Sequence, residues 1–372
     1  MKIITDRDLF LGGVGTVLGA VESRNAMPVL SNVLLTAEGD VLYIRATDLE
    51  VTIKTAYAVG VVEEGSVTLN GGKLHEVLRE IPSGDVSLAV DGDSRAYIQA
   101  EDGGRFELMG LHPDDFPPYH GVGGEIGHEV PCSVLAGMIK RTIYAASGED
   151  GRFNTNGIYV ERDDVAGCLR MVATNGHRLA IDEHYDDIRV AFPSDGGIIL
   201  PRKGAKEAAK FLGGADTAAF TFNERQAEFT VNNTTVSMVL LKGQFPDYQR
   251  IIPDDPDKRA VLDVESATRH LRRVSTMADE KSRAIALTFS NNNLEMASRN
   301  PNFGSSTTNM EIEYTGDPLA ITLNDRYLLD FLSVVGTGSL SVYMVDENHP
   351  IMIRHDGQSN PNYKYILMPM RA

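Results

Sequence analysis

The chain has 372 residues, of which 42% are hydrophobic and 23% are charged, as is ordinary for a globular protein. Its 35 Lys and Arg residues stand against 52 Asp and Glu residues, and the net charge of −17 argues against a general affinity for nucleic acid or anionic membranes. No apolar run reaches the roughly 18 residues of a membrane span, and the N-terminal MKIITDRDLF lacks the apolar segment of a signal peptide. We therefore expect a cytoplasmic protein of two or three domains, with Cys132 and Cys168 as buried thiols.

One pattern occurs three times along the chain: a short strand, a helix of about three turns, a Gly-containing turn and an alternating strand. The copies read VTLNGGKLHEVLREIPSGDVSLAVDGD (67–93), IILPRKGAKEAAKFLGGADTAAFTFNE (198–224) and ITLNDRYLLDFLSVVGTGSLSVYMVDE (321–347). Upstream of each copy, a strand closes on Ala-Thr or Ala-Ser and enters a polar turn, at 40–50, 167–180 and 293–304. Equivalent positions lie 123 to 129 residues apart, so each copy is the size of a domain.

A second helix opens each copy, with apolar residues at helical spacing in 6–22, 132–147 and 265–278. Two helices and many short alternating strands per copy predict an α+β domain with helices on one side of antiparallel sheets. The Gly- or Pro-rich segments 121–127 and 253–259 are the expected linkers. The predicted domains are therefore 1–124, 125–254 and 255–372.

Positive charge is concentrated in the six predicted helices. Segments 6–24, 73–81, 132–147, 202–213, 265–277 and 325–335 together carry +5, which leaves −22 for the rest of the chain. In LPRKGAKEAAKFLG (200–213), the side chains of Lys203, Lys206 and Lys210 share one helical face, opposite the apolar stripe. One basic helix is more often a solvated outer face, but several of them in an acidic chain indicate one electropositive surface. Such a surface binds phosphates without reading bases, and the lack of Trp disfavours a single-strand stacking site, so duplex DNA fits best.

Four motifs identify a family resemblance: LPRKG (200–204), ATNGHRLA (173–180), GQFPDYQRIIP (243–253) and the terminal YILMPMRA (365–372). With the three repeats, they closely resemble the bacterial sliding clamps, the beta subunits of DNA polymerase III. The resemblance implies three tandem clamp domains and a head-to-tail dimeric ring around duplex DNA that gives the polymerase its processivity. It also implies a protein that is not an enzyme, with no catalytic residues, no metal and no cofactor.

The resemblance implies three groups of site residues. The DNA contacts are Arg24, Lys73, Arg79, Lys140, Arg141, Arg152, Arg202, Lys203 and Lys206. A pocket for partner peptides comprises Thr174, Gly176, His177, Arg178, Leu179, Pro246, Arg250, Ile251, Asn324, Tyr327, Ile366, Met368, Pro369, Met370 and Arg371. The dimer interface comprises Arg105, Phe106 and Leu108 on one side and Thr276 and Met277 on the other. The implied partners of the pocket are the alpha and delta subunits of DNA polymerase III, the clamp loader and other proteins with a clamp-binding motif.

Some of these assignments also have a reason in the residues themselves. Met368 and Met370 are adaptable apolar side chains that suit several ligands, and Arg250 provides a cation for peptide carbonyls or carboxylates. The FPDY motif at 245–248 has a counterpart, FPPY at 116–119, which we expect to be structural only. The segment NPNFGSSTTNMEIE (300–313), expected at the dimer interface, has no charge before Glu311.

Two other classes of function compete with a clamp. An enzyme on a triplicated scaffold would need converging titratable groups, and the sequence has no metal-spaced His/Cys set, phosphate-binding Gly loop or nucleophile elbow. His177 is therefore better explained as a surface or capping residue than as a base. A clamp-like platform that binds proteins without encircling DNA is the second alternative, and the mass in solution would distinguish it from a ring.

Overall fold

The computed structural model describes residues 1–22, 27–123, 127–148, 153–163, 165–185, 190, 192, 196–253, 256–356 and 362–370. The chain divides into two compact units. Unit 1 contains residues 1–133 and 206–240, and unit 2 contains residues 134–205 and 241–372. The predicted domain boundaries at 124 and 254 stay a prediction.

All six predicted helical segments are helical in the structure. They form α1 (Arg7–Val17), α2 (Gly71–Glu80), α3 (Cys132–Thr142), α4 (Arg202–Phe211), α5 (Val264–Ser275) and α6 (Asp325–Val335). Short 3₁₀ turns extend α1 as η1 (Leu18–Ala20) and α3 as η4 (Ile143–Ala145). Four of the helices start at an Asp or Asn whose side chain accepts a hydrogen bond from a first-turn N–H, namely Asp6, Asn70, Asp263 and Asn324.

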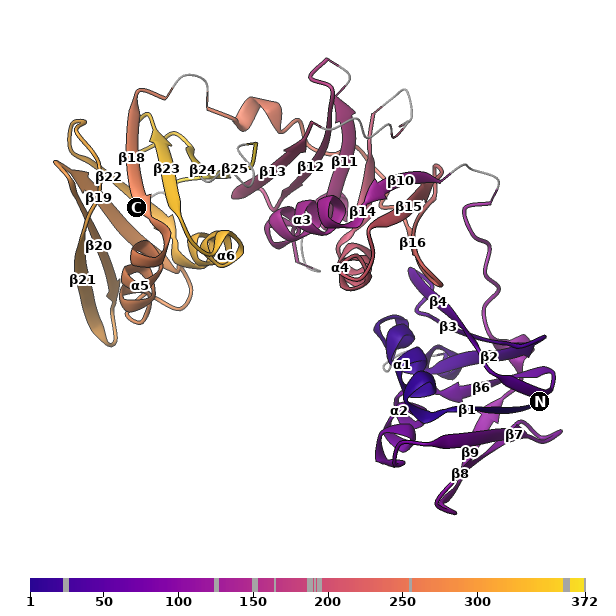
Figure 1. The fold of residues 1–372 in the computed structure, drawn as a ribbon. Helices are drawn as coiled ribbons and strands as arrows, with labels where there is room; N and C mark the ends of the chain where they lie inside the picture. Colours follow the sequence, from indigo (N-terminus) through magenta and orange to yellow (C-terminus); the bar gives the residue numbers. More distant parts are fainter. Residues whose placement is uncertain are drawn as a thin grey trace. The chain divides into compact units, whose positions relative to one another are not determined.

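Unit 1 is built on one continuous antiparallel sheet. In sheet order its strands are β10 (His128–Pro131), β15 (Thr217–Phe222), β16 (Gln226–Val231), β17 (Thr234–Val239), β4 (Val51–Ala58), β3 (Val41–Thr47), β2 (Asn32–Glu38), β6 (Gly65–Asn70), β9 (Arg105–Leu111), β8 (Arg95–Ala100), β7 (Asp85–Val90), β1 (Lys2–Asp6) and β5 (Gly60–Glu63). Helices α1 and α2 lie side by side against it (Figure 1). At Gly13 on α1 an added Cβ would lie 2.7 Å from the Tyr57 ring, so only glycine permits this approach of helix and sheet.

Unit 2 holds two antiparallel sheets. One contains β14 (Ile198–Pro201), β11 (Gly157–Asp163), β12 (Cys168–Thr174), β13 (Arg178–His184), β25 (Lys364–Leu367), β24 (Ile351–His355), β23 (Ser339–Met344) and β18 (Lys258–Asp263). The other contains β21 (Gly304–Glu311), β20 (Asn293–Asn300), β19 (Ala284–Ser290) and β22 (Leu319–Asn324). The strand β25 pairs with β13, so residues 364–367 lie beside the second repeat.

The core of unit 2 is apolar and partly aromatic. On α5 the side chains of Val264, Ala267, Leu271 and Val274 form the buried stripe expected from their helical spacing. On α6, Phe331 stacks on Tyr365 with ring centroids 4.8 Å apart. Cys132, in unit 1, and Cys168, in unit 2, are buried free thiols, as expected. Within the described ranges no helix is long and apolar enough to cross a bilayer.

Candidate nucleic-acid and partner interfaces

The predicted DNA contacts on α2 are exposed cations with acidic neighbours. The Nζ atom of Lys73 lies 2.6 Å from Oε2 of Glu76, and the Nε atom of Arg79 lies 3.2 Å from Oε1 of Glu80. The hydrogen bond from Lys73 lowers the pKa of the Glu76 carboxyl. Because exposed ion pairs are weak and screened by salt, these carboxylates leave both cations available for a DNA phosphate.

The predicted contacts on α3 and at the start of α4 differ in their exposure and in their hydrogen bonds to the rest of the protein. Lys140 is exposed. Arg141 is half-buried, and its Nε donates a hydrogen bond of 2.7 Å to Oδ2 of the fully buried Asp182 on β13. Arg202 is half-buried and donates to the carbonyl of Ser147 at 3.4 Å. Lys140 is therefore the more available of the two cations on α3, while Arg141 also anchors the helix to the sheet.

On α4 the three lysines of the predicted basic face are not equivalent. Lys206 is exposed and Lys203 is half-buried. Lys210 lies 2.6 Å from Oε2 of the buried Glu207, so its charge is locally neutralised. The Glu207 carboxylate lies against Gly19, where an added Cβ would be only 1.9 Å from Oε2. Gly19, in η1, therefore makes room for the side chain of Glu207 from α4.

The arginines of α5 were missed as candidate DNA contacts. Arg269, Arg272 and Arg273 are all exposed, and none forms an ion pair with a described residue. They lie opposite the apolar stripe of α5, and their spacing in the sequence could have identified them as an exposed basic face. Two predicted contacts, Arg24 and Arg152, lie outside the described residues.

The predicted partner site begins at the turn between β12 and β13. Its backbone is held by side chains of the turn itself: Oδ1 of Asn175 accepts from the N–H groups of His177 (3.0 Å) and Arg178 (3.1 Å). Oγ1 of Thr174 accepts from the N–H of Gly176, whose φ of +89° favours glycine. Gly176 and His177 are exposed, so the turn offers a rigid surface.

The C-terminal segment runs from this turn to the third repeat. The N–H of Met368 donates to the carbonyl of His177 at 2.9 Å, and the N–H of Met370 donates to the carbonyl of Thr322 on β22 at 2.8 Å. The side chain of Met368 is 38% exposed, and Pro369 is half-buried. The predicted Arg371 lies outside the described residues. Residues 368–370 thus join two repeats within unit 2.

An apolar cluster lies beneath these segments and includes predicted pocket residues. Leu179 and Ile366 are buried in it, Ile251 packs against it, and Phe245 stacks on Tyr159 with centroids 5.0 Å apart. Next to the cluster, Pro246 is half-buried and Arg250 is 85% exposed, with its Nε 2.7 Å from Oδ2 of Asp247. In its described part, the predicted partner site therefore has an apolar cluster beneath it and the exposed cation Arg250 beside it.

Arg178 lies in the predicted site but is 9% exposed, so most of its surface faces the protein. Its guanidinium lies over the ring of Tyr327 at 4.4 Å, pairs with Asp330 at 2.6 Å, and donates to the carbonyl of Tyr144. Asn324 caps α6 by accepting from the N–H groups of Arg326 and Tyr327. These residues fix α6 against the turn of the second repeat and so position the surface above them.

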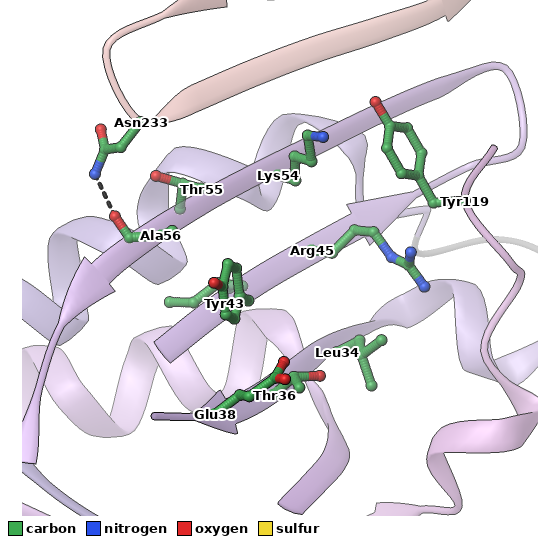
Figure 2. Close-up of a pocket in the computed structure, with 11 residues that line it drawn as sticks. Leu34, Thr36, Glu38, Tyr43, Arg45, Lys54, Thr55, Ala56, Tyr119 and Asn233 are labelled. Atoms are coloured by element: carbon green, nitrogen blue, oxygen red, sulfur yellow. Dashed lines mark hydrogen bonds between the residues drawn. The ribbon is translucent and has the colours of Figure 1, made fainter. Parts of the chain in front are cut away.

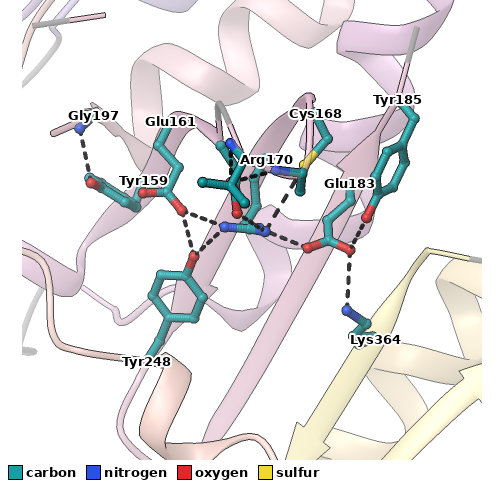
Figure 3. Close-up of polar contacts among 12 residues, drawn as sticks. Tyr159, Glu161, Cys168, Arg170, Glu183, Tyr185, Gly197, Tyr248 and Lys364 are labelled. Carbon is teal, nitrogen blue, oxygen red and sulfur yellow. Dashed lines mark hydrogen bonds and ion pairs between the residues drawn. The ribbon is translucent and has the colours of Figure 1, made fainter.

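Figure 3 shows a second buried cation, Arg170 on β12, surrounded by acidic and phenolic groups. Its nitrogen atoms lie 2.8 to 2.9 Å from carboxylate oxygens of Glu161, Asp163 and Glu183. The hydroxyl of Tyr248, from the FPDY motif, donates to Glu161 at 2.5 Å, and burial raises the pKa of this phenol. The FPDY segment is therefore locked onto the sheet of the second repeat.

The predicted dimer-interface residues lie on or beside two strands with open edges. On β9, residues 105–109 pair with β8, and their other edge has no strand neighbour within the described chain. Arg105 is exposed, and Phe106 and Leu108 are half-buried. In unit 2, β21 pairs only with β20 among the described strands and is an edge of its sheet. Thr276 caps the C-terminus of α5 and Met277 follows it, and α5 packs on β21.

Three sequence models of one family match successive parts of the chain. The N-terminal domain of the DNA polymerase III beta subunit matches residues 1–120, the central domain matches 129–247, and the C-terminal domain matches 249–371. The chain belongs to the DNA polymerase III beta subunit family. These matches confirm the predicted fold class of three tandem α+β clamp domains.

Curated and solved members of the beta subunit family are similar to the chain over its whole length. The beta sliding clamp of Caulobacter vibrioides is 34% identical over 377 positions, and that of Pseudomonas aeruginosa is 32% identical over 373 positions, each covering all of both chains. The crystal structure of the DNA polymerase III subunit beta from Pseudomonas aeruginosa has a TM-score of 0.92 over 100% of both chains. As a member of this family, the chain is a DNA sliding clamp that supports polymerase processivity.

Proposed function

We propose that two copies of this chain join head to tail into a closed ring around duplex DNA. The open edges of β9 and β21 support this, because an unpaired strand edge is a ready template for pairing with another chain. On this proposal Arg105, Phe106 and Leu108 of one copy face β21, Thr276 and Met277 of the other. Family matches at 1–120, 129–247 and 249–371 support the proposed domains 1–124, 125–254 and 255–372.

The DNA contacts are proposed to be cations on helices, and they hold the duplex through its phosphates alone. The observation that carries this proposal is the set of exposed helical cations in a chain of net charge −17. The proposed contacts among the described residues are the exposed Lys73, Arg79, Lys140, Lys206, Arg269, Arg272 and Arg273 and the half-buried Lys203, Arg141 and Arg202; the exposed Lys210 and Arg326 also lie on helices and are not assigned to the DNA. Contacts to phosphates are independent of sequence and exchange readily, so they permit sliding, while the closed ring prevents dissociation.

The partner site is proposed to bind short peptide motifs of the alpha and delta subunits of DNA polymerase III and of other clamp-binding proteins. Support comes from the exposed Met368, which is hydrogen-bonded to the rigid turn at 174–178, and from the exposed Arg250, whose neighbour Ile251 packs against the apolar cluster that contains Leu179 and Ile366. In this function the protein breaks no bond and needs no catalytic residue. Its proposed location is the cytoplasm, where the replicating DNA is.

Retention on circular DNA tests the ring directly. The clamp is loaded onto a nicked circular plasmid with a clamp loader, separated by gel filtration, and measured again after the plasmid is cut once. We expect clamp to be retained on the circle and lost from the linear form, together with a mass of two chains in solution. A mass of one chain with no retention on the circle would contradict the ring and favour a platform that binds proteins without encircling DNA.

A further inference from the structure

A cavity of about 450 Å³ lies on the first repeat, in unit 1, and the function proposed above does not use it. Strands β2, β3 and β4 form its floor, and Tyr119 of the FPPY motif and Asn233 also line it. Figure 2 shows Arg45, Lys54 and Tyr119 gathered toward one end, with Thr36 and Glu38 toward the other. Its volume lies within the range of about 300–1,000 Å³ that is typical of ligand pockets.

Two rows of side chains cross these strands and have counterparts in the second repeat. The rows are Leu34–Arg45–Lys54 and Thr36–Tyr43–Ala56 in the first repeat, and Tyr159–Val172–Ile181 and Glu161–Arg170–Glu183 in the second. The central strands β3 and β12 both end in Ala-Thr, which fixes this correspondence. The same register therefore carries different chemistry in the two repeats.

In the second repeat, the side chains of one row pack in the apolar cluster, and those of the other row form ion pairs with one another. Val172 and Ile181 belong to the apolar cluster, and Arg170 is paired with Glu161 and Glu183. The FPDY segment then closes over the rows, since the Tyr248 hydroxyl donates to Glu161 and accepts from Nη1 of Arg170 at 3.1 Å. No unpaired charge is left at these positions.

In the first repeat two cations, Arg45 and Lys54, stand where the second repeat has the apolar Val172 and Ile181. Arg45 and Lys54 stand directly opposite each other on β3 and β4, an arrangement that is unfavourable for like charges. Neither forms an ion pair with a described residue, and the Nε of Arg45 is buried without a hydrogen-bond partner. Burial lowers the pKa of Arg45. The small Ala56 stands where the second repeat has Glu183, and this leaves the space open.

The Tyr119 segment covers these cations without neutralising them. Nζ of Lys54 lies 4.5 Å from the centroid of the Tyr119 ring, and Nη2 of Arg45 donates to the carbonyl of Pro117 at 3.1 Å. The Tyr119 hydroxyl is already bonded to Glu228 at 2.5 Å. Glu38 lies four residues along β2 from Leu34, about 13 Å away at the rise of a strand, so it does not neutralise Arg45 or Lys54.

We propose that this cavity is a second peptide-binding site of the clamp, which takes a segment with an apolar side chain next to a carboxylate. The carboxylate pairs with Lys54 and Arg45, and the apolar side chain packs on Leu34, Tyr43 and Ala56. A carboxylate is favoured because Arg45 and Lys54 stand directly opposite each other and neither forms an ion pair with a described residue, whereas Arg170, in the adjacent row of the second repeat, is bound by Glu161 and Glu183. A peptide is favoured because the lining places apolar side chains, Leu34 and Tyr43, beside the two cations, and neighbouring residues of one peptide supply an apolar side chain and a carboxylate together.

Ligand-observed NMR titration of the full-length protein tests the site, with N-acetyl-Phe-Asp-amide as the acidic probe and N-acetyl-Phe-Asn-amide as its neutral match. We expect the acidic probe to bind about tenfold or more tightly than the neutral one, as a charge-assisted hydrogen bond predicts. Lys54→Gln should remove most of this difference. Ala56→Glu, which restores the acid of the second repeat and fills the cavity, should abolish binding without lowering the thermal midpoint.

Two control variants separate this site from other surfaces. Lys2→Gln changes an exposed lysine elsewhere in unit 1, and Arg250→Gln changes the proposed partner site in unit 2. Both should bind the acidic probe as the unsubstituted protein does. Equal binding of the two probes, or loss of binding in Arg250→Gln but not in Lys54→Gln, would overturn the proposal. Tighter binding of phenyl phosphate than of the acidic probe, lost in Lys54→Gln, would overturn the choice of a carboxylate ligand.

Discussion

Lys203 and Lys206 lie three residues apart on α4, where neighbouring side chains share a helical face. Each phosphate contact that a protein gives up lowers the salt dependence of its DNA affinity by about one unit of slope. For Lys203→Glu combined with Lys206→Glu, we therefore expect a slope reduced by about two and an affinity for duplex DNA lowered by about tenfold or more. The measurement is DNA binding at several salt concentrations, with the ring intact by gel filtration.

The matched control reverses two exposed lysines away from the helices, Lys2→Glu with Lys281→Glu. It makes the same change in net charge, so it separates a local contact from the general repulsion of an acidic protein. An equal loss of affinity in both double variants, or an unchanged slope in the α4 variant, would show that α4 does not face the DNA.

Charge can be read from the sequence, but burial and pairing across the sheet cannot. Arg141 and Arg178 looked like ligand contacts, yet Arg141 is paired with Asp182, 41 residues away, and Arg178 with Asp330, 152 residues away. These partners follow from strand register and from the packing of helices on sheets, neither of which local periodicity determines. Lys140, His177 and Arg250 are exposed, and their role as contacts, which does not depend on a distant partner, stays a prediction.

At the scale of elements, the helices could be predicted because the residues that mark a helix lie close together in the sequence. All six α-helices of the described residues were expected, and four of them start at an Asp or Asn cap immediately before an apolar-periodic segment. The repeats then gave the order of helix and strand in each domain. The pairing of β17 with β4 and of β13 with β25 could not be predicted, because it joins strands from different repeats.

Residues 368–370 are the element on which the proposed partner site depends most. Two backbone hydrogen bonds, to His177 and Thr322, hold this segment between the second and third repeats. Deletion of Met370 to Ala372 removes the second bond and part of the apolar surface, so we expect binding of partner peptides to fall at least about a hundredfold. Peptide titration by fluorescence anisotropy measures this loss, and gel filtration should still give two chains.

A deletion of Ala372 alone is the control for this truncation, because it keeps both methionines and Arg371. It should bind peptide as the full chain does. If the longer deletion binds peptide normally, the C-terminal segment is not part of the site. If it also loses the dimer, its effect is on the fold and the assignment of the segment to peptide binding fails.

At the scale of the whole molecule, two proposed interfaces differ in their electrostatics. The helices offer exposed cations to DNA, whereas β21 carries no charged residue before Glu311. The opposite strand, β9, has one Arg and one Glu, and Arg95 already lies 3.7 Å from that Glu107. An interface between these strands would be stabilised by main-chain hydrogen bonds and apolar contacts, which salt screens very little.

Salt should therefore separate the two interactions of the ring. Between 0.1 and 1 M NaCl we expect the dissociation constant of the dimer to change by less than about threefold, while contact with DNA phosphates weakens by several orders of magnitude. Analytical ultracentrifugation of labelled protein at nanomolar concentration measures the first, and binding to short linear duplexes measures the second. Leu108→Asp on β9 places an unpaired charge in the proposed interface and should shift the protein to single chains, whereas the same change at the exposed Leu49 should not. A dimer that dissociates more than about tenfold more readily in high salt would mean that charged groups outside β9 and β21 hold the ring together.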